Sequence, residues 1–237
     1  MKRRKKIVVT GGTGRFGSIL KKSKFNYQMF FPKKSKLNVT KFESIKRYLA
    51  KTRPHCLIHL AGLSRPMRIH EKEISKSIEL NIVGTANVVR ACKMFNTKLI
   101  YFSTSYVYPG KKGGYKETDA LLPSNNYAWS KLGGESAVQM YKNSLIIRAS
   151  MTEKPFVHKR AFANVFTNFI YHRDFIKIFK KLINKKGIIN VGGPTRSVYN
   201  FVKLQNPKIK KVFLKNKKRS LMPTNSSMNL GKLKKFL

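Results

Sequence analysis

The sequence predicts an α/β fold, a doubly wound parallel sheet followed by a small C-terminal region. Over the first 150 residues, short apolar runs alternate with amphipathic stretches, which is the pattern of parallel strands joined by crossover helices. A glycine-rich turn directly follows the first apolar run. From about Met151 the alternation loosens and a lysine-rich tail follows. We therefore expect a main domain over residues 1–150 and a shortened lid over residues 151–237.

Each expected strand is a short run of apolar and β-branched residues, bounded by glycine, proline or charged residues. In chain order, the expected strands are Lys6–Thr10, Tyr27–Phe31, Cys56–Leu60, Leu99–Ser103, Leu145–Arg148 and Gly187–Val191. Each expected helix carries apolar residues at three- and four-residue spacing. The expected helices are Phe42–Ala50, Ile74–Phe95, Tyr127–Tyr141, Ala161–Ile170 and Phe175–Leu182.

Charge is the unusual feature of the composition. There are 51 lysines and arginines against 9 aspartates and glutamates, a formal net charge of +42. Lysine far exceeds arginine, and asparagine, isoleucine and phenylalanine are plentiful, which favours a compositional bias. The basic clusters at 2–6, 177–186 and 203–219 lack the interleaved aromatic residues of an RNA-binding surface. We expect non-specific binding to polyanions and no specific nucleic-acid partner.

The sequence argues against a membrane protein and a metalloprotein. No apolar run approaches the roughly 18 residues that span a bilayer. The apolar run after Lys2–Lys6 breaks at Thr10, too early for a signal peptide, so we expect a soluble cytoplasmic protein. Cys56 and Cys92 are expected to be buried reduced thiols. No group of histidine, cysteine and acidic residues has the spacing of a metal site.

A phosphate-binding loop is predicted at residues 10–17, which read TGGTGRFG. Gly11 lets the chain turn sharply, Gly14 lets backbone N–H groups approach a pyrophosphate, and Gly17 lets the helix pack on the strand. The N-terminus of the following helix adds partial positive charge. The loop therefore predicts a Rossmann-type site for a dinucleotide.

The choice between the two nicotinamide dinucleotides depends on the residues after the second expected strand. NAD-preferring proteins carry an acidic residue there, which accepts hydrogen bonds from the adenosine ribose. In this chain the corresponding segment, Phe30–Lys34, contains no carboxylate, and Arg15 lies inside the glycine-rich loop. Our hypothesis is that NADP(H) is more favourable than NAD(H), with Arg15 and Lys33 or Lys34 near the 2′-phosphate.

Tyr127 and Lys131 form the candidate proton-transfer pair. Residues four apart on a helix project from one face, and a nearby ammonium lowers the pKa of a phenol. Tyr127 can then exchange a proton with a carbonyl oxygen near neutral pH. The run Ser103–Gly110 follows the apolar run Leu99–Phe102, at the carboxyl end of a strand where ligands bind in such sheets. A hydroxyl in this run could bond the same oxygen.

Several motifs in order resemble the extended short-chain dehydrogenase/reductase family, also called NAD-dependent epimerase/dehydratases. They are TGGTGRFG at 10–17, LNVT at 37–40, HLAG at 59–62, STSYVYPG at 103–110, YKETD at 115–119, LPSNNYAWSKLGGE at 122–135, IIRAS at 146–150 and NVGGPTRSVYNF at 190–201. Within this family, the motifs at 103–110 and 122–135 are most similar to dTDP-4-dehydrorhamnose reductases.

The resemblance implies residue roles and a reaction. It implies Thr104, Tyr127 and Lys131 as catalytic residues, with hydride transfer from a nicotinamide to a nucleotide-activated keto sugar and Tyr127 as proton donor. It implies cofactor contacts from Gly11, Thr13, Gly14, Arg15, Phe16, Gly17, Asn38, Val39, Leu60, Ala61, Gly62, Tyr127 and Lys131. Ser105 and Arg196 are the candidate substrate contacts. Arg196 follows the strand Gly187–Val191 and could bind a diphosphate, but it could equally be a surface arginine.

Three departures keep other functions open. Ser105 stands where the reductases typically carry aspartate, Asn38 replaces the aspartate usual near the adenine, and the region after residue 150 is short. The alternatives are a nucleotide-sugar epimerase, a catalytically weak regulatory subunit of the same fold, and a polyanion-binding protein. The sequence does not name the sugar or nucleotide, nor does it decide whether the chain forms a homodimer.

Overall fold

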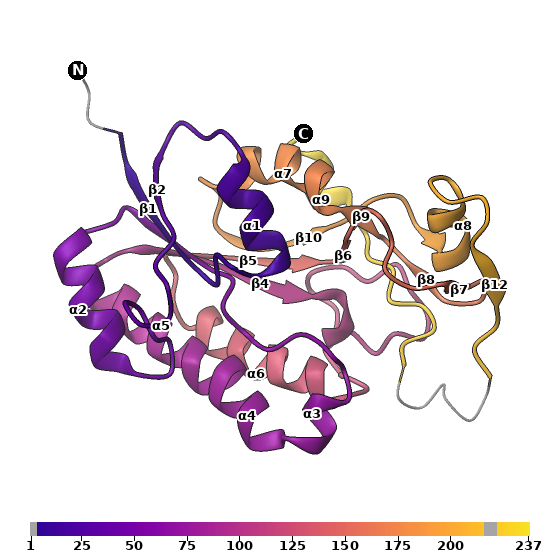
Figure 1. Cartoon of the computed structure of the whole chain (residues 1–237), viewed down its shortest axis with the longest axis horizontal. Coiled ribbons are helices and arrows are strands. Elements are labelled where there is room, and N and C mark those ends of the chain that lie inside the picture. The colour runs from indigo at the N-terminus through magenta and orange to yellow at the C-terminus, as the bar shows by residue number, and fades with distance from the viewer. Residues whose placement is uncertain (1–3, 216–221) are drawn as a thin grey trace. The chain divides into compact units, whose positions relative to one another are not determined.

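The computed structural model describes residues 4–215 and 222–237, and its central feature is a six-stranded sheet in the order β10-β5-β4-β3-β1-β2 (Figure 1). The strands are β1 (Lys6–Thr10), β2 (Gln28–Phe30), β3 (Cys56–His59), β4 (Lys98–Thr104), β5 (Ser144–Ala149) and β10 (Gly187–Val191). Strand β1 pairs in parallel with β2 and β3, and β3 pairs in parallel with β4. These pairings and the strand order confirm the predicted α/β fold. All six predicted strands are present, but β10, which the sequence placed in the C-terminal region, belongs to the main sheet beside β5.

Most predicted helices are also confirmed. They are α2 (Phe42–Thr52), α6 (Asn126–Gln139) and α7 (His172–Leu182), and α1 (Arg15–Lys22) follows the glycine loop. The helix predicted over 74–95 is divided into α4 (Ile74–Ile78), a π-helical turn (Glu79–Val83) and α5 (Gly84–Met94). Shorter helices are α3 (Ile69–Lys72), α8 (Val198–Lys203) and α9 (Gly231–Lys234).

The chain folds into two compact units, each built from several segments. The first unit comprises residues up to 103, 130–146 and 183–187; the second comprises 104–129, 147–182 and 188–237. Each unit therefore takes segments from both sides of residue 150. The division into a cofactor domain over 1–150 and a substrate lid over 151–237 concerns function, and it stays a prediction.

The first unit is layered as the sequence pattern predicts. Strand β1 contributes Ile7, Val8 and Val9, which are fully buried. In Figure 1, α1 covers one face of strands β1 to β4, and α2 and α5 cover the other. On α1, Phe16 is buried and its ring lies 5.3 Å from that of Phe102 on β4. Helix α1, which follows the carboxyl end of β1, is thus packed against the sheet.

The second unit corrects the predicted helix over 161–170. This segment instead forms the short strands β7 (Arg160–Phe162), β8 (Phe166–Thr167) and β9 (Ile170–Tyr171). They pair respectively with β12 (Lys210–Val212), β11 (Arg196–Ser197) and β6 (Met151–Thr152). The apolar spacing resembled a helix, but the segment is rich in aromatic and β-branched residues and its backbone groups bond distant strands.

The core of the second unit explains this spacing. Ala161 and Val165 are buried against α8 and the segment after it, in a cluster completed by Val198, Val202, Ile209 and Leu214. Phe162 and Phe169 pack against the same cluster. Ala161 and Val165 are thus buried by side chains from elsewhere in this unit, and Phe166 stays exposed, so the apolar residues do not form one face of a helix.

The other sequence-based expectations have mixed outcomes. Cys56 and Cys92 are buried free thiols, as predicted, and burial raises the pKa of Cys56 to about 12. Among residues 4–215 and 222–237, no helix is long and apolar enough to cross a membrane, and no group of three potential ligands could hold a metal. The basic clusters at 2–6 and 203–219 extend into residues outside those described.

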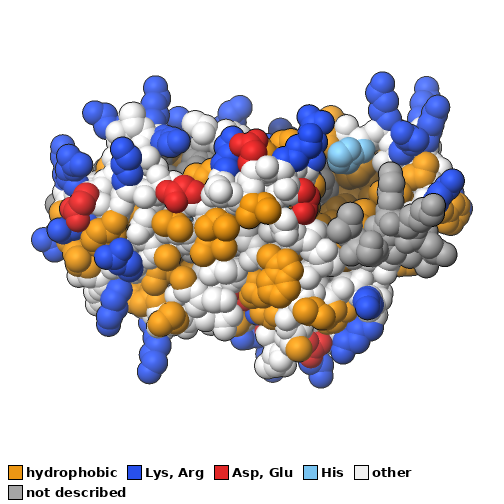
Figure 2. Space-filling view, turned by 90° about the horizontal axis from the view of Figure 1, so that it is seen from below, with side chains coloured by type: hydrophobic (Ala, Val, Ile, Leu, Met, Phe, Trp, Pro, Cys, Tyr) orange, Lys and Arg blue, Asp and Glu red, His pale blue; other side chains and the backbone are white. Residues whose placement is uncertain are grey.

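The basic residues do not gather into one patch on the face seen in Figure 2. Blue side chains are scattered over this face, with a few red ones between them. Some acidic residues form exposed pairs with lysines one helical turn away, such as Glu43 with Lys46 and Glu73 with Lys76. Such exposed pairs contribute little to stability. The charge on this face therefore marks no single binding site.

Candidate active site

The glycine loop of the first unit needs glycine at the two positions where backbones meet. Gly11 has a φ of +70°, and a Cβ there would lie 2.5 Å from the Ala61 amide nitrogen. A Cβ on Gly17 would lie 2.4 Å from the Gly11 carbonyl oxygen. Because these neighbours are backbone atoms, they cannot move aside as a flexible side chain could.

The start of α1 fits an anionic group. A Cβ on Gly14 would meet only the Gly11 carbonyl oxygen, at 3.2 Å, so the approach to this N-cap is open. Within the described helix α1, the first turn holds no acidic residue and no side chain caps it. Backbone N–H groups and the helix dipole therefore favour a phosphate here. The pyrophosphate of a dinucleotide fits this cradle.

Basic side chains surround the same loop. Arg15 is exposed, and its guanidinium donates a hydrogen bond of 3.0 Å to Ser64 Oγ. The side chain of Phe31 lies beside Gly12, where a Cβ would come within 2.8 Å of it. The segment after β2 therefore runs along the loop, and its Lys33 and Lys34 are exposed. The contact of these cations with an additional phosphate stays a prediction.

The remaining predicted cofactor contacts also belong to the first unit. The Asn38 Oδ1 atom accepts hydrogen bonds from the Thr40 amide (3.2 Å) and hydroxyl (3.1 Å), so it stabilises its own turn. Val39 is buried, while residues 60–62 follow β3 and are partly or fully exposed. These positions follow the glycine loop along the chain, and their roles in binding a cofactor stay predictions.

Thr104 and Tyr127 both contact Tyr106 within the second unit. Thr104 ends β4, and its Oγ1 accepts a hydrogen bond of 3.3 Å from the Tyr106 amide. The ring of Tyr106 in turn meets the Tyr127 ring edge-on, with centroids 6.4 Å apart. Tyr127 is half-buried near the start of α6. Tyr106 therefore connects the two predicted catalytic residues.

Helix α6 begins at a side-chain cap that the sequence analysis overlooked. The Asn125 side-chain oxygen accepts a hydrogen bond of 2.9 Å from the Ala128 amide. Asparagine before an amphipathic run is a typical signal for the start of a helix. The cap fixes the first turn of α6, which carries Tyr127, and Lys131 follows one turn later on the same helix.

The surroundings of Lys131 in the first unit shift its pKa. Its Nζ lies 4.1 Å from the centre of the Tyr101 ring, whose hydroxyl donates to the Lys131 carbonyl at 3.0 Å. Desolvation lowers the pKa of Lys131 to about 7, and the Glu135 carboxylate opposes this shift. Glu135 is itself buried and accepts a hydrogen bond from the Ser103 hydroxyl. Lys131 thus titrates close to neutrality.

Asn81 supports the first unit through the π-helical turn. Its side chain is buried; the oxygen accepts from the Leu63 amide at 2.7 Å, and the nitrogen donates to the Leu63 carbonyl at 2.9 Å. The same nitrogen donates to Ser130 Oγ at 2.8 Å. Asn81 therefore ties the segment after the predicted cofactor contacts 60–62 to the residue next to Lys131.

The two predicted substrate contacts lie in the second unit. Ser105 is buried and its hydroxyl accepts a hydrogen bond of 2.8 Å from Ser150 Oγ, which accepts from Thr167 at 3.2 Å. Thr167 on β8 is paired with Arg196 on β11. Arg196 is exposed and lines an open pocket of about 510 Å³ together with Asn200, Lys203 and Leu204. The pocket presents two cations, and its use by a substrate stays a prediction.

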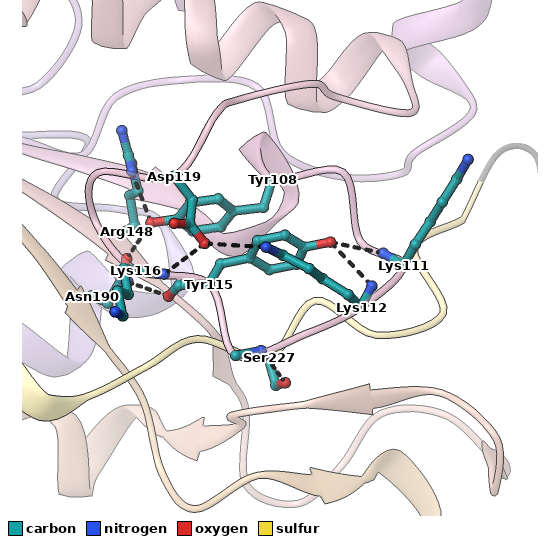
Figure 3. A network of polar contacts seen from close by, with 10 residues as sticks. Tyr108, Lys111, Lys112, Tyr115, Lys116, Asp119, Arg148, Asn190 and Ser227 are labelled. Carbon is teal, nitrogen blue, oxygen red and sulfur yellow. Dashed lines mark hydrogen bonds and ion pairs between the residues drawn. The ribbon is translucent and has the colours of Figure 1, made fainter.

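A buried polar network stabilises the segment that follows Thr104 (Figure 3). Arg148 is only 2% exposed; it donates to the Tyr108 hydroxyl at 2.8 Å and to the Glu117 carbonyl at 3.0 Å. The Tyr108 hydroxyl also bonds the Asn190 side-chain oxygen, and the Tyr108 ring stacks on Tyr115 at 4.9 Å. The sequence analysis missed this network because its members are far apart in the chain.

Comparison with known proteins gives a family match over most of the chain. Residues 5–185 match the family described as RmlD substrate binding domain. A dTDP-4-dehydrorhamnose reductase from Aggregatibacter actinomycetemcomitans is 27% identical over 202 residues, covering 81% of this chain and 63% of that protein. The methionine adenosyltransferase 2 subunit beta of Xenopus tropicalis is 30% identical over 143 residues, covering 56% of this chain and 42% of that protein. The chain thus spans less than two thirds of these relatives.

A solved structure has the same fold. The crystal structure of dTDP-4-dehydrorhamnose reductase from Bacillus anthracis in complex with NADP superposes with a TM-score of 0.89 and 24% sequence identity. The superposition covers 99% of this chain and 94% of that chain. The similarity extends over both compact units.

Proposed function

Because the chain belongs to the RmlD substrate-binding-domain family, we propose that it is a nicotinamide-dependent reductase of a nucleotide-activated keto sugar. The carrying observation is the position of Lys131, one helical turn after Tyr127 and seated on the Tyr101 ring. The open N-terminus of α1 and the required glycines of the loop support a dinucleotide site in the same unit as Lys131. The relative named as a dTDP-4-dehydrorhamnose reductase supports the substrate class.

In this proposal, each residue of the site has a defined role in the reaction. The reduced nicotinamide, when bound, supplies the hydride for the keto carbon. Thr104 donates a hydrogen bond to the keto oxygen, and Tyr127 gives its phenolic proton to that oxygen as negative charge develops. The Lys131 ammonium stabilises the phenolate that remains and holds the nicotinamide ribose. Arg196 binds the substrate diphosphate.

We further propose NADP(H) as the preferred cofactor. Arg15 at the start of α1 and the exposed Lys33 and Lys34 beside the loop provide cations for a 2′-phosphate. The absence of an acidic residue in the 30–34 segment removes the partner that a free ribose would use. Comparing Michaelis constants for NADPH and NADH tests this preference. A lower constant for NADH would contradict it.

The proposal is tested by incubating the full chain with NADPH and dTDP-4-keto-6-deoxy sugars and following the loss of NADPH absorbance. Reduction that Tyr127→Phe abolishes would support it. Conversion between two sugars without net loss of NADPH would instead indicate an epimerase, which can use the same tyrosine and lysine. The predicted cytoplasmic location is part of the proposal, and fractionation of cells that produce the chain would test it.

A regulatory subunit is the second candidate. The relative named as a methionine adenosyltransferase subunit, 30% identical over 143 residues, favours it. In that case the chain would bind NADPH but reduce no sugar, and it would change the activity of a catalytic partner subunit. Cofactor binding without turnover, across a broad panel of nucleotide sugars, would favour this candidate.

A further inference from the structure

Four hydrogen bonds pass through the interior of the first unit, and His59 lies at their centre. The Thr10 hydroxyl oxygen accepts from the Ala61 amide at 3.2 Å and lies 2.8 Å from His59 Nδ1. On the other side, His59 Nε2 lies 3.1 Å from Thr85 Oγ1, and the Thr85 hydroxyl donates to the Asn81 carbonyl at 2.7 Å. These side chains and the Asn81 carbonyl form the His59 relay.

The partners fix the direction of every bond in the relay. A carbonyl oxygen only accepts, so the Thr85 proton points to Asn81 and the Thr85 oxygen can only accept from His59. His59 therefore carries a proton on Nε2. With the Ala61 amide donating to its oxygen, Thr10 keeps its own proton for His59 Nδ1. The geometry thus selects one tautomer and one orientation of both hydroxyls.

The environment keeps the imidazole neutral, as this scheme requires. His59 is 2% exposed, and burial together with the Lys131 ammonium lowers the pKa of His59 to about 3. The Tyr101 ring lies 6.0 Å from the imidazole and adds no charge. Among the described residues, Lys131 is the charged group whose repulsion lowers the pKa of His59. A single proton on the ring is therefore the stable state near neutrality.

We infer that His59 is a positioning residue for the cofactor loop: in its Nε2–H tautomer, it orients the Thr10 hydroxyl and thereby the Ala61 amide. Thr10 is the last residue of β1 and opens the glycine loop, while Ala61 lies 2.5 Å from where a Cβ on Gly11 would be. The orientation of the Thr10 hydroxyl thus bears on the tightest backbone contact of the loop.

The relay also reaches α6. The Thr85 hydroxyl donates to the backbone carbonyl of Asn81. The side chain of Asn81 in turn bonds the Leu63 backbone and the Ser130 hydroxyl. Ser130 directly precedes Lys131 on α6. One continuous set of buried bonds therefore joins the opening of the glycine loop to the helix that carries the proposed catalytic lysine. Within the relay, His59 bonds Thr10 at the end of β1 on one side and Thr85 on α5 on the other.

The first test does not need the proposed function. Nitrogen-15 NMR of the full chain with labelled histidine reads the protonation of each ring nitrogen, and the His59→Asn variant assigns the signals. We expect the His59 Nε2 to be protonated and Nδ1 unprotonated, without titration between about pH 6 and pH 8. A proton on Nδ1, or titration in that range, would overturn the inference.

The second test rests on the proposed function, since it measures NADPH binding. His59→Asn keeps an acceptor near the position of Nδ1, whereas His59→Gln keeps a donor near Nε2 and leaves Thr10 without its acceptor. Val88→Ala, a buried position on α5 outside the relay, is the control for lost stability. We expect His59→Gln to raise the dissociation constant about tenfold, and the other two variants to stay within about twofold of wild type.

The outcomes distinguish a failure of the positioning role of His59 from a failure of the proposed function. Equal weakening by His59→Asn and His59→Gln would mean that the histidine only fills space, which overturns the positioning role. Weakening by Val88→Ala as large as by His59→Gln would have the same meaning. A wild-type chain that binds neither NADPH nor NADH would refute the proposed function, whereas the NMR result would still decide the tautomer and the direction of the relay.

Discussion

Raising the pH through neutrality is expected to deprotonate Lys131 and thereby to weaken cofactor binding. The pKa of this lysine is lowered to about 7 by desolvation. About half of the chains then carry the ammonium at pH 7 and about one tenth at pH 8. Because the lysine is proposed to hold the nicotinamide ribose and to stabilise the Tyr127 phenolate, catalytic efficiency should follow that fraction.

The assay is kcat/KM for NADPH at saturating sugar substrate, measured across the neutral range, because this ratio reports groups of the free enzyme. We expect a plateau below about pH 6 and a fall of about tenfold per pH unit well above pH 7. Glu135→Gln removes the carboxylate that raises the pKa of Lys131, so the fall should begin at lower pH. Glu73→Gln, which disrupts an exposed pair with Lys76, is the matched control.

Lys131→Arg separates the lysine from other titrating groups. A guanidinium stays charged throughout this range, so the alkaline fall should disappear even if the variant is slower. The reasoning would be refuted by a fall at the same pH in Glu135→Gln and wild type. It would also be refuted by a fall that persists in Lys131→Arg, which would point to Tyr127 or another group.

Four further changes test other parts of the site. Tyr127→Phe should lower turnover by about 10²–10⁴-fold with little change in the NADPH dissociation constant, measured by fluorescence titration; unchanged turnover would place the proton donor elsewhere. Gly17→Ala should weaken NADPH binding and lower the melting temperature, because its Cβ would lie 2.4 Å from the Gly11 carbonyl; a variant with normal binding would contradict the cradle. His59 has a pKa of about 3 in the folded chain against 6.5 when unperturbed, so its contribution is complete above about pH 6.5 and falls as the pH is lowered. Urea titrations should show a loss of about 2 kcal/mol at pH 5 that His59→Asn lacks. Arg148→Met should lower the free energy of unfolding by about 3 kcal/mol in the same assay, because it deprives the buried Tyr108 hydroxyl and the partly buried Glu117 carbonyl of a donor. A loss near zero would show that these oxygens find other donors.

The sequence predicted the parts of the site that depend on local geometry. The spacing of Gly11, Gly14 and Gly17 encodes where the backbone turns and where two backbones touch, so it could be interpreted without knowing the rest of the fold. Tyr127 and Lys131 share one helix, and their spacing alone places them one turn apart. The buried strands were recognisable because each is a short apolar run with its own boundaries.

The sequence did not predict features that depend on residues far apart in the chain. The role of His59 could not be predicted, since its partners Thr10 and Thr85 are 49 and 26 residues away. The helix expected over 161–170 was wrong because its apolar residues meet α8 and its backbone pairs with three separate strands. The interleaving of the two units follows from the same long-range pairing, which periodicity does not record.

Ser105 shows how a departure from the family pattern can be interpreted once the contacts are known. An aspartate at this position would be a charged group that accepts hydrogen bonds and costs desolvation when buried. Ser105 is 1% exposed and receives the Ser150 hydroxyl, so it needs no charge and keeps a proton to donate. Through Ser150 and Thr167, these hydroxyls connect the neighbour of Thr104 to the strand paired with Arg196. The serine therefore joins the proposed catalytic threonine to the proposed diphosphate contact by neutral bonds within one unit, and its presence does not by itself argue against the reductase.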